Sequence, residues 1–260
     1  DLNSSSQELL GIYPKIYGTI LPSSFETIGV FNLNGFINYS VNDITSNIQL
    51  NTSNGSVVCD LNLYEFKNID NAKYRGSFRG EGVKLSNFIN LPFLGNSDFQ
   101  FTIDGKGFVP EFLNSKLEGE IQKLTLNNYE YNSIKVFGDV SDKVFNGNLS
   151  IIDDDIDMDF IGLIDYSDEL IDFDFSTKIN KANIGKLNFT FDQDNSLSGI
   201  ISTKLRGSSV SDLIGDISFS DFKYQSGNSN FNFDELLAQS RINNEKRFYS
   251  INSPDAVSGI

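Results

Sequence analysis

The stretch Ile151–Ser167, IIDDDIDMDFIGLIDYS, mixes aspartates with large apolar side chains. From Ile156 onward, apolar residues alternate with Asp157 and Asp159. A period of two residues is typical of a β-strand with one apolar face and one polar face. We therefore expect Asp153 and Asp154 to begin a turn, and the aspartates from Asp155 to Asp159 to face water, because burying each carboxylate would cost several kcal/mol.

Two chemical alternatives for these aspartates are disfavoured. A calcium-binding EF-hand loop requires Gly at its sixth position and an acid at its twelfth. Counted from Asp153, those positions are Met158 and Ile164, and the register from Asp155 fails in the same way. Paired carboxylates for glycoside cleavage need one raised pKa, yet no acidic residue falls on an apolar face. We expect no metal site and no catalytic residue.

The composition narrows the function further. The chain has 260 residues, a formal net charge of −15, no His and one Cys. We expect a strongly acidic chain to bind nucleic acid poorly, because phosphate binding needs clustered Lys and Arg. The absence of His removes the commonest general base and most zinc sites. We therefore expect a protein that is not an enzyme and binds no cofactor.

The same alternation recurs along almost the whole sequence. Polar turn signals such as LNNYE and VSDK separate the runs, and we count roughly fifteen strands, mostly in sequential hairpins. Asn146-Gly147 resembles a hairpin turn, but the alternation continues through it, so we place it inside a strand. Leu187, Phe189 and Phe191 are predicted to form another strand. Helical spacing predicts short helices over 7–22 and 83–90.

Two architectures can hide one apolar face by hairpins alone. In a sandwich or closed barrel the strands fill their own interior, whereas a long curved sheet can fold into a groove that a ligand fills. Glycines recur on the apolar face, where they mark bends or close approach, although barrel corners would also explain them. We expect an all-β fold: a long, curved, mostly antiparallel sheet folded into an elongated apolar groove over 1–260, with one or two short helices. Alternation does not decide whether the groove is open or self-filled.

A family resemblance supports the groove. LEGEIQKLTLNNYEYNSIKVFGDVSDKVFNGNLSIIDDDIDMDFIGLIDYS, FDFSTKINKANIGKLNF and SDLIGDISFSDFKY, beginning at Leu117, Phe173 and Ser211, resemble periplasmic repeats of the TamB family. TamB is the AsmA-like inner-membrane subunit of the translocation and assembly module, and the style of the sequence is similar to Bacteroidetes members. The resemblance implies a β-taco, a folded sheet that bridges the periplasm.

The same resemblance implies a function, a location and partners. The function would be carriage of phospholipid between the inner and outer membranes and support of outer-membrane assembly. The partners would be phospholipid acyl chains and, through parts of the protein outside this chain, an outer-membrane barrel protein of the Omp85 type. The chain lacks the family's anchor helix and its C-terminal region. We therefore expect an internal periplasmic fragment of a protein held in the inner membrane by a segment not present here.

The residues that would line the groove come from the apolar faces of the predicted strands. Their shared role would be to solvate acyl chains without specificity. They are Phe99, Phe101, Ile103, Ile134, Val136, Phe145, Leu149, Ile156, Met158, Phe160, Phe173, Phe175, Phe189 and Phe191. Two other hypotheses stay open: a structural or adhesive all-β module of a secreted or surface protein without a lipid ligand, and a chaperone-like groove for outer-membrane protein segments.

Overall fold

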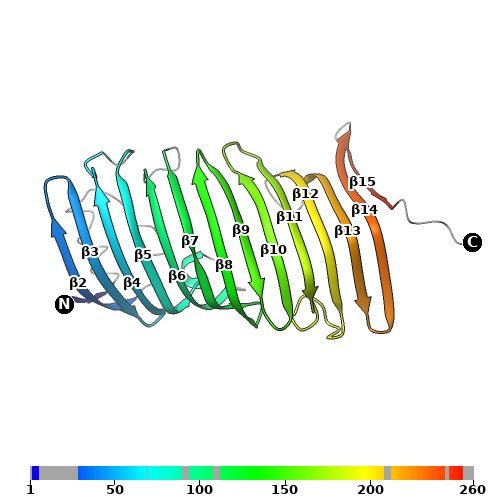
Figure 1. Ribbon diagram of the computed structural model, residues 1–260, viewed down its shortest axis with the longest axis horizontal. Coiled ribbons are helices and arrows are strands. Elements are labelled where there is room, and N and C mark those ends of the chain that lie inside the picture. The colour runs from blue at the N-terminus through cyan, green and yellow to red at the C-terminus, as the bar shows by residue number, and fades with distance from the viewer. Residues whose placement is uncertain are drawn as a thin grey trace, which may run out of the picture. The chain divides into compact units, whose positions relative to one another are not determined.

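The chain folds into one open β-sheet. The computed structural model describes residues 2–5, 29–68, 70–89, 94–107, 112–207, 212–243 and 246–253. Fifteen strands lie in the sheet in their sequence order, β1 to β15, so each strand pairs with the next one along the chain (Figure 1). Pairing joins β1 to β2 and β14 to β15 but does not join β1 to β15, so the described strands do not close into a barrel.

The strands are long, mostly of nine residues or more. Their bounds are β1 Leu2–Ser5, β2 Val30–Tyr39, β3 Asp43–Thr52, β4 Gly55–Tyr64, β5 Lys73–Lys84, β6 Leu94–Lys106, β7 Asn114–Leu126, β8 Tyr129–Ser141, β9 Val144–Ile152, β10 Ile156–Asp165, β11 Ile171–Ala182, β12 Ser196–Gly207, β13 Ile214–Ser226, β14 Ser229–Asn243 and β15 Lys246–Asn252. The expected all-β class and antiparallel hairpin order are confirmed.

Short turns impose the hairpin order. Asn127 and Asn128, between β7 and β8, have φ of 52° and 62°. Asp142 and Lys143, between β8 and β9, have φ of 53° and 63°. Positive φ at both central residues defines a type I′ turn, whose twist matches that of the strands it joins. The predicted turns in LNNYE and VSDK are therefore confirmed.

The prediction that Asn146-Gly147 lies inside a strand is also confirmed. Gly147 lies within β9 and pairs with Gly138 of β8 on one side and Gly162 of β10 on the other. The actual reversal occurs earlier, at Asp142-Lys143, so β8 and β9 keep their apolar residues on one face.

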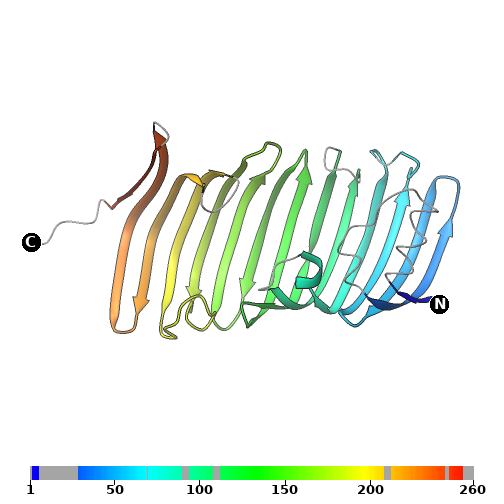
Figure 2. The same ribbon diagram turned by 180° about the vertical axis from the view of Figure 1, so that it is seen from behind.

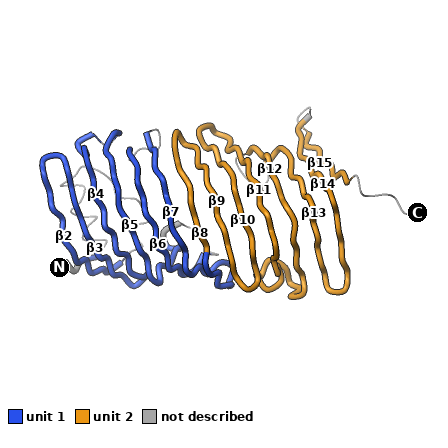
Figure 3. Tube along the Cα trace, viewed as in Figure 1, with its two compact units in different colours: residues 1–133 blue, residues 134–260 orange. Residues whose placement is uncertain are grey.

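The chain divides into two compact units, unit 1 over Asp1–Ser133 and unit 2 over Ile134–Ile260 (Figure 3). Both are built in the same way, because antiparallel register places apolar residues opposite apolar residues on one face of the strands.

Few apolar side chains are fully buried in either unit. In unit 1, Tyr74, Val83 and Tyr131 retain 5%, 5% and 3% of their exposed surface. In unit 2, buried side chains gather where two connections meet: Ile151 and Ile156 flank the β9–β10 turn, and Ala182 ends β11. Most other apolar residues on the described strands are half-buried.

The strand predicted at Leu187, Phe189 and Phe191 is wrong. Residues 184–191 form a compact run of turns between β11 and β12. Leu187 N–H donates to the Asn183 carbonyl at 3.0 Å, and Phe189 N–H donates to the Ile184 carbonyl at 2.9 Å. These bonds keep the backbone groups within the segment, and Leu187 is 1% exposed beneath it. Only Leu187 of the three apolar residues is buried, since Phe189 and Phe191 are exposed.

The helices differ from the predictions in extent. The segment predicted over 83–90 is helical only at α2, Ser86–Ile89, because Val83 and Lys84 still belong to β5. Figure 2 shows α2 from behind, where it packs beside β6. The helix predicted over 7–22 lies outside the described residues.

Candidate functional site

The apolar face of unit 1 centres on β6. Phe99 pairs with Gly80 of β5 and Ile121 of β7. Phe101 pairs with Phe78 on one side and Gly119 on the other, and Ile103 pairs with Gly76 and Leu117. Paired residues of an antiparallel sheet share a face. The predicted lining residues of β6, namely Phe99, Phe101 and Ile103, are therefore brought together on one surface.

Three phenylalanines form a cluster on this face. The ring centroids of Phe78 and Phe99 are 6.2 Å apart, and the ring centroid of Phe101 lies 5.7 Å from each of them. Such offset and tilted contacts are the favoured arrangements of aromatic rings. Phe78 was missed as a lining residue, although its alternation with Tyr74 and Gly80 in YRGSFRG carries the signal.

Glycines give these rings their positions. A Cβ atom on Gly80 would lie 2.5 Å from the Phe99 ring. A Cβ atom on Gly119 would lie 2.2 Å from the backbone oxygen of Gln100 and 2.5 Å from Cδ1 of Phe101. Both glycines therefore mark close approach of the neighbouring strand, by a ring alone at Gly80 and by backbone and ring at Gly119.

Unit 2 also carries an apolar face. One row crosses seven strands, from β8 to β14, through Val136, Leu149, Phe160, Thr177, Ile201, Phe219 and Leu236. We call this set the central row. Its apolar members are all half-buried, and Thr177 is buried at 8% exposure. Two shorter rows run beside it on the same face. One joins Val140, Phe145 and Ile164. The other joins Ile151, Met158 and Ile179.

Phe173 and Phe175 complete this face on β11. Phe173 pairs with Ile164 and Leu205, and Phe175 pairs with Gly162 and Thr203. The rings of Phe160 and Phe175 are 5.1 Å apart at an interplanar angle of 38°. The central glycine again makes room, because a Cβ on Gly162 would lie 2.2 Å from Cβ of Phe175.

Four predicted lining residues differ from the rest. Ile134 and Ile156 are on the face but only 3% and 8% exposed, so their own neighbours cover them. Phe189 and Phe191 are not on a strand, and are 60% and 108% exposed in the β11–β12 connection. We therefore leave these four out of the surface that could contact a ligand.

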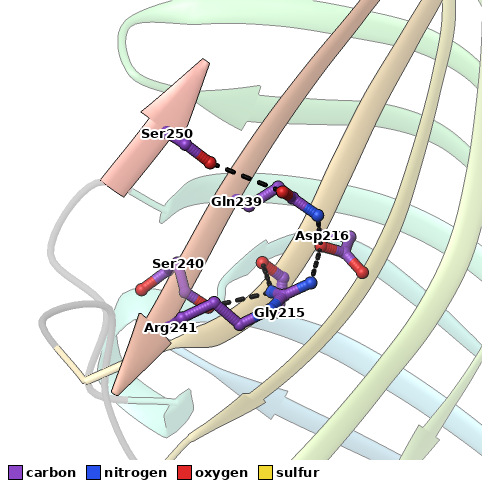
Figure 4. Close-up of polar contacts among 6 residues, drawn as sticks. All are labelled: Gly215, Asp216, Gln239, Ser240, Arg241 and Ser250. Carbon is purple, nitrogen blue, oxygen red and sulfur yellow. Dashed lines mark hydrogen bonds and ion pairs between the residues drawn. The ribbon is translucent and has the colours of Figure 1, made fainter. Parts of the chain in front are cut away.

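The opposite face of unit 2 carries ionic and amide side chains. Lys204 of β12 pairs with Asp174 of β11 and Asp216 of β13 in the sheet register, and its Nζ lies 3.4 Å from an Asp174 oxygen. Gln239 of β14 donates to Asp216 Oδ1 at 2.9 Å, and Ser250 of β15 donates to Gln239 at 3.4 Å (Figure 4). This row runs parallel to the apolar rows on the reverse of the same strands.

Arg241 lies two residues beyond Gln239 on β14 and contacts this polar row. Its guanidinium forms an ion pair with Asp216 and donates to the Gly215 carbonyl at 2.8 Å (Figure 4). The hydrogen bond from Arg241 and that from Gln239 lower the pKa of the Asp216 carboxyl. Both partners of the ion pair are nearly half exposed, so the pair adds little stability. Its consequence is a face that stays charged in water.

Asp155 does not face solvent as predicted. Its side chain is 16% exposed, and it accepts hydrogen bonds from Asn183 Nδ2 at 2.6 Å and Lys186 Nζ at 3.1 Å. The Asn183 N–H also donates to the Asp155 carbonyl at 2.8 Å. The Asn183 hydrogen bond, with smaller contributions from Lys186 and Lys181, lowers the pKa of the Asp155 carboxyl. Asp155 therefore anchors the β11–β12 connection, whereas Asp159 is exposed as predicted.

Cys59 faces the apolar surface of unit 1, where it pairs with Ile48 and Phe78. Partial burial, with a smaller effect of the neighbouring Asp60 charge, raises the pKa of its thiol. A raised pKa leaves the thiol protonated at neutral pH and unreactive as a nucleophile.

The described residues offer little for other chemistry. Within the ranges given above, no three His, Cys, Asp or Glu side chains gather where they could hold a metal ion. No helix within those ranges has the length and apolar character needed to cross a membrane. What the arrangement offers is a half-exposed apolar surface in each unit.

Comparison of the chain with models of protein families, with characterised proteins and with solved structures finds no match.

Proposed function

We propose that this chain is a segment of a periplasm-spanning hydrophobic β-groove that carries phospholipid between the inner and outer membranes and supports outer-membrane assembly. The observation that carries the proposal is the central row, in which apolar side chains from successive strands adjoin and remain half-exposed. A fully self-packed interior would leave such side chains buried.

An acyl chain gains free energy when it leaves water for an apolar surface. Transfer of one CH2 group from water to an apolar surface is favourable by about 0.8 kcal/mol, so a tail of about 16 carbons crossing water bare faces a barrier on the order of 10 kcal/mol. An apolar row that continues from strand to strand lowers this barrier along its whole length. Because the rows cross the strands, a chain lying along one row would contact Leu149, Phe160 and Ile201 in turn.

The charged reverse face fits the same role. Asp174, Lys204 and Asp216 give the reverse of the strands charged side chains that favour contact with water. The net charge of −15 disfavours adsorption on an anionic membrane surface. Lipid would therefore contact the apolar face as single molecules rather than as a bilayer surface.

Native mass spectrometry of the purified chain, combined with lipid extraction, tests the proposal. We expect co-purifying phospholipid in the wild-type chain and its loss in Phe160→Asp, since a carboxylate in the central row repels acyl chains. The control is Ile161→Asp, the next residue on the opposite face, which is 64% exposed. If the wild-type chain carries no phospholipid or detergent, the proposal is contradicted. The alternative of a structural all-β module without a lipid ligand would then be favoured.

A second candidate, a chaperone-like surface for outer-membrane protein segments, is favoured by β15. Among the described strands β15 pairs only with β14, so one edge of its backbone is available to another strand. Phe248, Tyr249 and Ile251 on this strand are 53%, 73% and 72% exposed. Addition of a strand at such an edge is a known mode of peptide recognition. Photo-crosslinks from β15 to nascent barrel proteins, with none to lipid from the central row, would select this candidate.

A further inference from the structure

The connection between β11 and β12, which is not part of the strands, presents two phenylalanine rings to solvent. Phe189 is 60% exposed, and Phe191 is 108% exposed, the highest value among the large apolar side chains of the described residues. Single exposed apolar residues are ordinary on a protein surface. Two aromatic rings on one short segment, one of them without any cover from the chain, instead mark a contact with another molecule or a membrane.

A preformed loop carries these rings. Phe189 N–H donates to the Ile184 carbonyl at 2.9 Å. Thr190, between the two rings, donates through Oγ1 to the Asp192 carbonyl at 3.1 Å and accepts from Asn195 Nδ2 at 3.2 Å. Hydrogen bonds on both sides of the rings fix the backbone in the conformation that exposes them. Little further ordering is therefore needed when the rings bind, which favours binding.

The charges that flank the rings are negative. Asp192 and Asp194 follow Phe191 directly and are exposed. Lys186, the one cation in the sequence of 183–195, pairs with Asp155 at 3.1 Å. Exposed carboxylates beside aromatic rings are complementary to a cation, and an ammonium group is attracted to the face of such a ring.

This charge pattern matches the surface of a zwitterionic bilayer. In phosphatidylcholine and phosphatidylethanolamine the ammonium group is the outermost charge, and hydrocarbon lies beneath it. Rings that pass the headgroups would reach hydrocarbon, while the carboxylates beside them stay at the level of the ammonium groups. An anionic bilayer, by contrast, would repel Asp192 and Asp194.

The residue types favour a bilayer over a protein partner. The residues that dominate binding between proteins are enriched in Trp, Tyr and Arg, and none of these occurs within 183–195. A phenylalanine ring has no polar atom, so it gains most from contact with hydrocarbon. Phe is also among the residues that surface-bound proteins bury at the boundary of headgroups and acyl chains.

We propose that the β11–β12 connection docks unit 2 on a zwitterionic bilayer surface. Phe189 and Phe191 enter the interface, and Asp192 and Asp194 meet the ammonium groups of the lipid. This docking is independent of the proposed lipid carriage, because it uses none of the residues of the central row.

A single tryptophan reports the docking, since the chain has none of its own. In the whole chain carrying Phe191→Trp, we expect phosphatidylcholine vesicles to shift the emission to the blue, and lipid brominated on its acyl chains to quench it. The matched control is Phe137→Trp, because Phe137 is 48% exposed in the middle of β8, on the face opposite the central row. It should give neither signal.

Flotation with the same vesicles measures the affinity. Phe191→Ser and Phe189→Ser should each weaken binding about tenfold, the effect expected of one ring that no longer leaves water. Phe137→Ser should leave binding unchanged. Replacing part of the phosphatidylcholine by phosphatidylglycerol, which lacks an ammonium group, should weaken binding.

Phe160→Asp separates this docking from lipid carriage, since it should abolish co-purification of phospholipid and leave vesicle binding unchanged. The docking proposal is overturned if the wild-type chain does not float with phosphatidylcholine vesicles, which would favour a protein partner for the loop. It is equally overturned if phosphatidylglycerol strengthens binding, if Phe137→Trp responds as Phe191→Trp does, or if binding survives both serine substitutions in the loop.

Discussion

Because Phe99 lies over Gly80, we predict that substitutions at these two positions are energetically coupled. A Cβ on Gly80 would meet Phe99 Cε1 and Cζ at 2.5 Å and Val83 Cγ2 at 2.9 Å, and these are all side-chain atoms. Ordinary contact of such atoms is about 3.5 Å or more, so Gly80→Ala must push the ring about 1 Å out of place. Overpacking of this kind costs about 1–3 kcal/mol, partly offset by about 0.5–1 kcal/mol from the lower chain entropy of Ala in the unfolded state. We expect a net loss of about 1–2 kcal/mol.

The closest clash is with the ring, so removing the ring should remove most of the cost, while the Val83 contact at 2.9 Å remains. In a Phe99→Ala background we expect Gly80→Ala to cost clearly less, with a coupling energy of about 1 kcal/mol in the double-mutant cycle. The matched control is Gly76→Ala, whose Cβ would meet the backbone carbonyl oxygen of Asp60 at 2.1 Å. Its cost should be the same with or without the Phe99 ring.

Urea unfolding of the four chains of each cycle, followed by circular dichroism, measures these free energies. The slope of the unfolding free energy against urea must be equal among the chains for the cycle to be valid. Equal costs of Gly80→Ala in both backgrounds would refute the ring-over-glycine packing. A control cycle that couples as strongly as Gly80 would refute it as well.

Three further predictions concern the faces and the anchor. Phe160→Asp should abolish phospholipid co-purification while Ile161→Asp retains it, as measured by lipid extraction, and equal loss in both would contradict the assignment of faces. Asp155→Asn should lower the free energy of unfolding by about 1–3 kcal/mol at pH 7, since it removes the charge from a hydrogen-bonded carboxylate. The pKa of Asp155 is lowered in the folded state. Its contribution to the free energy of unfolding is therefore complete above the unfolded pKa of about 3.9 and is lost as the pH falls from there through the folded pKa. If wild type and Asp155→Asn differ as much in strong acid as at pH 7, the charge does not stabilise the fold. Cys59 should react with iodoacetamide more slowly at pH 8 than a free thiol, because its pKa is raised; a rate equal to that of glutathione would contradict this.

The alternation of residues was enough to predict the face of almost every strand. Phe99, Phe145 and Phe173 lie on the apolar face because period two and hairpin turns together leave a single consistent register. The prediction of a strand failed where local backbone hydrogen bonds take the place of pairing with a neighbouring strand. Leu187 and Phe189 alternate like a strand, but the Asn183 and Ile184 carbonyls accept their N–H groups locally.

Two other features depend on contacts between distant positions. Asp155 reads as one more solvated aspartate until Asn183 and Lys186 are placed beside it. From the sequence, the glycines of the apolar face could equally mark bends of the sheet. The pairing of Gly80 with Phe99 in the structure shows that this glycine makes room for an aromatic ring. Half-exposure of the central row likewise depends on packing, which alternation does not encode.

Site-specific photo-crosslinking in cells tests the central claim most directly. A benzophenone amino acid placed at Phe160 or Phe219 lies in the central row, and the same group at Ile161 lies on the opposite face. The account predicts phospholipid adducts from positions 160 and 219 and none from 161. Adducts from all three positions alike, or from none, would contradict the claim that the apolar face is open to acyl chains.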